Sequence, residues 1–179
     1  YIALAKQAIA DPAVKGVTVH PGRRGWSSAT LRRVRPVGSA PAMPRCPGAL
    51  VLLEFTNFNE YNIVFGSRRG DELLKLAGDI VSKIWNNHLM VRARIGEATF
   101  ALGVGDLTLE EVQEFGQMLH HSLALRLSGE DYSGYADFRC GGAYFQRKGT
   151  LPALLVTAKQ AISQSRNRLE NVFELLQCG

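Results

Sequence analysis

A run of five consecutive apolar residues, Ala49 to Leu53, restricts the fold more than any other feature of the sequence. A strand with one face in water alternates apolar and polar residues, whereas a strand covered on both faces is apolar throughout. The run therefore predicts a buried strand in a central sheet that carries helices on both of its faces.

The residues after this strand predict a helix and then a hairpin. Apolar residues recur at the spacing of a core-facing helix over residues 69–86. Residues 88–95 and 98–104 resemble two strands around a tight turn that contains Gly96 and Glu97. Such a pattern predicts an antiparallel hairpin.

The C-terminal half continues the alternation of helices and strands. Thr108 and Glu111 match a capping box, which predicts a helix from there to about residue 125. Residues 137–145 predict a strand, residues 150–168 a final helix, and residues 171–176 a short closing strand. The order β-α-α-β-β-α-β-α predicts a single domain of the α/β (α+β) class.

The first 48 residues differ in charge from the rest of the chain. They hold eight Lys or Arg against one acid, Asp11, and so carry +7; subtracted from the whole-chain charge of +5, this leaves −2 elsewhere. Residues 1–10 predict the end of a helix, residues 26–34 a short helix, and residues 35–48 a loop rich in Pro and Gly. A basic stretch of this kind fits a solvated linker, or contact with nucleic acid, acidic lipid or another domain.

Several classes of protein are excluded by composition. No apolar run in the 179 residues approaches the roughly 20 needed to cross a bilayer. The chain has an odd number of cysteines, Cys46, Cys140 and Cys178, and they lack the spacing of a zinc site. A disulfide framework and a thiolate zinc site are therefore not expected, and a reducing cytoplasm fits best. His120 and His121 are adjacent, so on a helix they point about 100° apart and cannot share a metal as an i,i+4 pair would.

Two segments resemble the GGDEF family. Residues 54–71 read EFTNFNEYNIVFGSRRGD, which is similar to the family's D-x-D-x-F-K-x-I-N-D-x-x-G-H-x-x-G-D. The shared positions are Phe58, Asn62, Gly66, Gly70 and Asp71. Residues 94–100, RIGEATF, stand where the family has R-x-G-G-D-E-F. Weaker likenesses follow the family's order at residues 17–24, 140–143 and 161–172.

The resemblance implies both a fold and a reaction. GGDEF domains are diguanylate cyclases, in which two domains meet face to face, each holding one GTP. Mg²⁺ helps the 3′-hydroxyl attack the α-phosphate, and the product is cyclic di-GMP. The implied fold is a mostly antiparallel central sheet flanked by helices over residues 15–179, with the basic loop 35–48 inside it. Residues 1–14 are then the end of an upstream linker helix.

Carried over residue by residue, the resemblance retains nucleotide recognition better than catalysis. Asn62 and Asp71 match the guanine-reading pair, because an amide and a carboxylate together satisfy the donors and acceptors of that base. Arg166 keeps a positive charge at the phosphate-binding Lys, and Glu54 keeps a carboxylate at the first metal position. The alternative is structural: Asn62 caps a turn, Asp71 begins a helix, and Arg166 is a solvated side chain.

The hairpin departs from the family pattern at three positions. Ala98 has no ligand atom at the metal-binding position, and Thr99 replaces the following Glu with a neutral hydroxyl. Glu97 replaces the second Gly and adds a negative charge where the triphosphate is expected. A one-residue shift would bring Glu97 to the metal position. That shift would break the match at Arg94 and Phe100 and exchange the two faces of the strand.

The family's product-inhibition site is also missing, since Asn87 and Met90 stand at its two charged positions. We therefore expect a catalytically inactive GGDEF domain that regulates, dimerises or scaffolds in cyclic di-GMP signalling, with weak GTP binding as its remaining ligand chemistry. No cofactor is required under this hypothesis, and Mg²⁺ with GTP is doubtful. The expected partners are an EAL or sensor domain of the same chain, a second copy, or another GGDEF protein.

Two alternatives stay open. The first is a diguanylate cyclase with residual activity that uses Glu54 and Glu97. The second is a basic module for nucleic acid or a membrane surface. This alternative is the least supported, because residues 23–45 hold a single aromatic residue, Trp26. Nucleic acid is therefore not an expected partner. The expected location is the cytoplasm, including the cytoplasmic part of a membrane-bound receptor.

Overall fold

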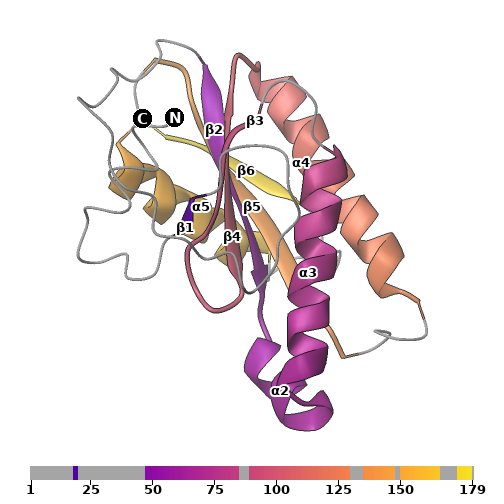
Figure 1. Cartoon of the computed structure of the whole chain (residues 1–179). Coiled ribbons are helices and arrows are strands. Elements are labelled where there is room, and N and C mark those ends of the chain that lie inside the picture. The colour runs from indigo at the N-terminus through magenta and orange to yellow at the C-terminus, as the bar shows by residue number, and fades with distance from the viewer. Residues whose placement is uncertain are drawn as a thin grey trace.

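A six-stranded sheet forms the centre of the computed structural model, which describes residues 18–19, 47–84, 89–129, 135–147, 150–165 and 173–178. The strand order is β1-β3-β4-β2-β5-β6 (Figure 1). The strands are β1 (Thr18–Val19), β2 (Gly48–Phe55), β3 (Leu89–Arg94), β4 (Thr99–Gly105), β5 (Phe138–Phe145) and β6 (Glu174–Gln177). Every neighbouring pair is antiparallel except β5 and β6, which confirms the expected mostly antiparallel sheet.

The apolar run that predicted a covered strand lies in β2, at the centre of the sheet. Val51 and Leu53 contribute to one apolar cluster, whereas Leu50 and Leu52 contribute to a second one. Alternate residues of a strand point to opposite faces of the sheet, so both faces of β2 are covered. The prediction of a strand buried on both sides is confirmed.

The described part of the chain contains four helices, three of which pack against the sheet. They are α2 (Phe58–Phe65), α3 (Ser67–Ile84), α4 (Leu109–Leu127) and α5 (Leu151–Ser165). Helices α3 and α4 lie together on one face and share the larger apolar cluster, and α5 covers the other face (Figure 1). The predicted capping box is present, since the Thr108 side chain accepts from the Glu111 backbone and the Glu111 side chain accepts from the Thr108 backbone.

Two features of the fold differ from the sequence-based expectation. The helix expected from residue 69 begins at Ser67, directly after α2, and the two helices are separated by Gly66 at φ +84°. Only glycine adopts this left-handed backbone without strain. The strand β1 was not predicted, because two residues are too few to show a periodic pattern.

Several expectations lie outside the described residues: the linker helix 1–14, the helix 26–34, most of the loop 35–48, and the positions Asn87 and Arg166. The domain limits therefore stay a prediction. Of the helices that the structure describes, none combines the length and the apolar character that crossing a membrane requires.

Candidate nucleotide site

The β3–β4 hairpin has the register expected from the family pattern. Arg94 lies opposite Phe100 in the ladder, and the Ile95 amide donates to the Thr99 carbonyl at 2.9 Å. Phe100 is 1% exposed and Ala98 is 7% exposed, and both belong to the cluster beneath α3 and α4. Since these two side chains are buried on one face, Thr99 points to the opposite face.

Arg94 closes the turn of this hairpin. Its Nε donates to the Gly96 carbonyl at 3.2 Å, and its Nη2 donates to the Glu97 carbonyl. Partial burial of the guanidinium lowers the pKa of Arg94, while attraction to the carboxylates of Asp71 and Glu97 opposes that change. The turn and the first part of α3 therefore lie close enough to share one cation.

Asn62 and Asp71 are brought together by the α2–α3 junction. A Cβ added at Gly70 would lie 1.9 Å from Asn62 Oδ1, so the amide packs against the α3 backbone one residue before Asp71. Asn62 Oδ1 is buried and has no hydrogen-bond partner among the described residues. The Asp71 side chain is exposed.

The structure places these two residues differently from the positions that the structural alternatives assumed. Asn62 lies inside α2, and its side-chain oxygen accepts no hydrogen bond from a described residue. Helix α3 begins at Ser67, so Asp71 is already in its second turn.

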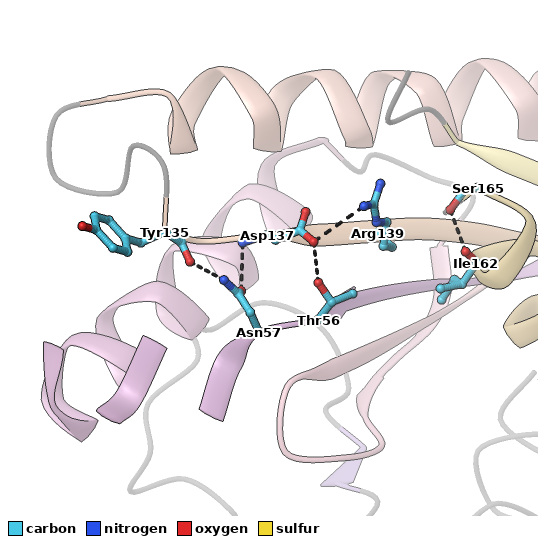
Figure 2. Close-up of polar contacts among 7 residues, drawn as sticks. All are labelled: Thr56, Asn57, Tyr135, Asp137, Arg139, Ile162 and Ser165. Atoms are coloured by element: carbon cyan, nitrogen blue, oxygen red, sulfur yellow. Dashed lines mark hydrogen bonds and ion pairs between the residues drawn. The ribbon is translucent and has the colours of Figure 1, made fainter. Parts of the chain in front are cut away.

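A set of long-range hydrogen bonds fixes the end of β2 next to the start of β5 (Figure 2). The Thr56 hydroxyl donates to Asp137 Oδ2 at 2.6 Å, and the Asn57 side chain bonds to the backbone of Tyr135 and Asp137. Arg139 approaches the same Asp137 oxygen at 3.7 Å. These contacts could not be predicted from the sequence, because no local pattern indicates that positions about 80 apart are paired.

Glu54 lies near the end of β2. It is half-buried, lies opposite Thr99 and Arg139 in the sheet, and forms no hydrogen bond or ion pair with any residue that the structure describes. No group of three His, Cys, Asp or Glu within the described ranges could hold a metal ion. With the Ala98 methyl buried in the core, Glu54 is the only carboxylate that the described structure offers at the expected metal positions.

Two positions of the expected site cannot be placed. Arg166 and Asn87 lie outside the described residues, and for Met90 only the backbone, within β3, is described. The structure therefore brings together Asn62, Asp71 and the hairpin, and leaves Glu54 as a single carboxylate.

Comparisons with known proteins show which solved structures have a similar fold. The active GGEEF domain of a diguanylate cyclase from Vibrio cholerae matches with a TM-score of 0.64 and 17% identity over 73% of this chain and 83% of that chain. The GGDEF domain of YfiN from Pseudomonas aeruginosa matches with a TM-score of 0.62 and 19% identity over 76% and 86%. An EAL/GGDEF domain protein from M. capsulatus matches with a TM-score of 0.58 and 21% identity over 74% and 86%. These likenesses show the fold, and a comparison with curated proteins gave no match.

The family itself is shown by sequence. The model described as "Diguanylate cyclase, GGDEF domain" matches residues 38–172, about three quarters of the chain. That range contains both segments of the family pattern and every strand of the sheet from β2 to β5. The chain belongs to the GGDEF family, the diguanylate cyclase-like domains of cyclic di-GMP signalling.

Proposed function

We propose that this GGDEF domain is catalytically silent and acts as a regulatory, dimerisation or scaffolding module in cyclic di-GMP signalling. The observation that carries the proposal is the placement of Ala98, whose methyl group is buried in the core and whose carbonyl accepts from the Phe55 amide at 3.1 Å. The position that should offer a carboxylate to the metal is thus part of the apolar interior.

The remaining candidate ligands support the same proposal. Glu54 is the only carboxylate at the expected metal positions, since Ala98 has no ligand atom and Thr99, opposite Glu54 in the sheet, offers only a neutral hydroxyl. Phosphoryl transfer between two nucleotides requires cations that neutralise the charge developing on the phosphate oxygens. With one carboxylate at the expected metal positions, the described part of the domain offers Mg²⁺ fewer ligands than the family pattern does, which weakens its hold on the metal.

A module of this kind acts through its neighbours. We propose as partners an EAL or sensor domain in the same chain, a second copy, or another GGDEF protein. The likeness to an EAL/GGDEF domain protein from M. capsulatus supports the first of these. A gene whose reading frame continues past residue 179 into an EAL sequence would support this arrangement, and a reading frame without any such domain would contradict it.

The proposed lack of diguanylate cyclase activity is tested by incubating the protein with GTP and either Mg²⁺ or Mn²⁺, followed by chromatography for cyclic di-GMP. We expect no product above a protein-free blank, with an active diguanylate cyclase domain run in parallel as the positive control. Cyclic di-GMP that disappears in a Glu54→Gln variant would overturn the proposal and establish residual cyclase activity.

A further inference from the structure

The sheet carries a positive charge directly beside Glu54. In the ladder, Glu54 of β2 lies opposite Arg139 of β5. Side chains that lie opposite each other in an antiparallel pair leave the sheet on the same face, with Cβ atoms about 4.5–5.5 Å apart. Leu50 and Leu52 share this face with Glu54 and pack beneath α5. Arg139 is therefore the closest neighbour of Glu54 on β5, on the face that α5 covers.

Polar contacts keep the Arg139 side chain close to the sheet. Its Nη2 lies 3.7 Å from Asp137 Oδ2, the oxygen that also accepts from the Thr56 hydroxyl at 2.6 Å (Figure 2). The Asp137 amide donates to Asn57 Oδ1 at 2.9 Å, which fixes the backbone that carries this carboxylate. The Arg139 side chain is 20% exposed, so its guanidinium lies over the sheet and does not extend into solvent.

Arg139 is the single cation in the four strands β2, β4, β5 and β6. The other charged residues of these strands are the carboxylates Glu54 and Glu174. Glu174 lies opposite Gly141, two residues along β5 from Arg139, so it leaves the sheet on the same face. Together with Asp137, which directly precedes β5, three carboxylates surround this one guanidinium.

The cations of the neighbouring described elements lie elsewhere. Arg94 is opposite Phe100 in the ladder, so its side chain leaves the other face of the sheet and closes the hairpin turn. The basic residues of α3 belong to the helix layer on that other face. Helix α5 has Lys159 as its one charged residue between Leu151 and Ser165, and Lys159 is exposed. Within the described structure, the charge of Glu54 is therefore balanced first by Arg139.

A guanidinium in this place competes with a divalent cation. Mg²⁺ binds carboxylate oxygens at about 2.0–2.1 Å, so a metal on Glu54 would lie within a few ångströms of the Arg139 side chain. Two positive charges at such a separation repel each other, and the repulsion is stronger in a partly buried place than in water. The neighbour that neutralises Glu54 thus also makes metal binding at Glu54 unfavourable.

We propose that Arg139 takes the place of the divalent cation at this end of the sheet: its guanidinium neutralises Glu54 and Asp137 and excludes Mg²⁺ from Glu54. The inference rests on the proposed function in one respect, the absence of cyclase activity. It goes further by naming the residue that makes this end of the sheet independent of metal. Replacing that one side chain should therefore open the position to a metal ion.

The experiment is urea unfolding with and without MgCl₂ at about 10 mM, with NaCl of equal ionic strength as the reference. The midpoint of the unmodified protein should not respond to Mg²⁺ beyond the effect of NaCl. Arg139→Met keeps a long unbranched side chain without the charge. It should lower the midpoint by about 0.5 M or more, because Glu54 and Asp137 lose their nearest cation. Mg²⁺ should then recover at least about half of that loss.

Three further variants separate the charge of Arg139 from its packing. Arg147→Met removes an exposed cation just beyond the other end of β5 and should show neither effect. Arg139→Lys keeps the charge and should stay insensitive to Mg²⁺. Arg139→Met combined with Glu54→Gln should lose the Mg²⁺ response, because the carboxylate that would bind the metal is gone.

The inference would be overturned by stabilisation of the unmodified protein by Mg²⁺, by an Arg139→Met variant as stable as the parent, or by a destabilised variant that ignores Mg²⁺. If Arg139→Met does not fold, Mn²⁺ titration of the unmodified protein, followed by the EPR signal of the free ion, still decides. We expect no bound ion, and binding that Glu54→Gln abolishes would refute the role of Arg139.

These outcomes are separable from that of the cyclase assay. Formation of cyclic di-GMP refutes the lack of activity, whatever the unfolding experiments show. A metal effect on the unmodified protein without any product refutes the role of Arg139 and leaves the proposed function in place.

Discussion

Restoring the family's carboxylate at position 98 is the sharpest test of how the hairpin is built. Ala98 is 7% exposed and lies in the apolar cluster with Phe100. Its backbone is fixed by the bond from the Phe55 amide to its carbonyl, so a longer side chain has to enter the core or distort the turn. We therefore expect Ala98→Asp to destabilise the domain by about 2–4 kcal/mol at pH 7, the cost of a buried and unpaired carboxyl group.

The penalty should depend on pH with a defined sign. Burial raises the pKa of a new carboxyl above its unfolded value of about 3.9, so the folded state holds the proton more tightly than the unfolded state does. The destabilisation is then smallest below pH 4, grows as pH rises above about 3.9, and levels off above the folded pKa. Ala98→Asn has nearly the same shape without the titrating charge, so its penalty should be independent of pH.

Urea unfolding of both variants at pH 5 and pH 8 measures this difference directly. In thermal melts, 3 kcal/mol corresponds to a lowering of Tm by about 6–12 °C. If Ala98→Asp were as stable as the parent at pH 8, the methyl group would not be in the core. If Mg²⁺ specifically restored the stability of Ala98→Asp but not of Ala98→Asn, the new carboxylate would reach a metal site. Either result would refute the reasoning.

Three further substitutions or labelling experiments test neighbouring parts of the structure. Gly70→Ala places a methyl 1.9 Å from Asn62 Oδ1 and 3.1 Å from the Phe58 ring, so the Asn62 side chain must move, and calorimetry should show the loss of the weak GTP binding expected of the domain. Gly141→Ala brings a Cβ to 2.7 Å from the Ile162 backbone nitrogen, so α5 must move and urea unfolding should show a loss of about 1–3 kcal/mol. Burial raises the pKa of the Cys140 thiol, so in a chain where it is the only cysteine its reaction with a thiol reagent at pH 8 should require unfolding; rapid labelling of the native protein would contradict its burial.

The sequence predicted the parts of the fold that depend on local patterns. The continuous apolar run of β2, the periodic face of α3 and the capping box at Thr108 each report burial or hydrogen bonding within a few residues. What it could not predict are the contacts between distant segments. The bond from Thr56 to Asp137 and the pairing of β1 with β3 leave no local signature, since each partner is an ordinary residue of its own segment.

For the candidate site, the sequence identified residue types and the structure supplied their environment. Asn62 and Asp71 were named from the family pattern, and the packing of the amide against Gly70 explains why they lie together. The loss of a carboxylate at Ala98 was readable from the sequence, but its burial was not. The role of Arg94 as the donor that closes the turn was missed, because a side chain that bonds to its own hairpin gives no signal in the residue pattern.

The register of the hairpin also weighs against residual activity. For Glu97 to become the metal ligand, β4 would have to slip by one residue, and its alternating faces would be exchanged. Phe100, Leu102 and Val104 are each at most 1% exposed, and all three would leave the cluster beneath α3 and α4. Smaller residues such as Ala101 and Gly103 would take their places, and at about 2 kcal/mol for each large side chain lost from the cluster the slip costs roughly 6 kcal/mol, a large part of the 5–15 kcal/mol that stabilises a typical domain. A metal held by Glu97 and Glu54 would have to offset that cost, so packing favours the observed register of the hairpin.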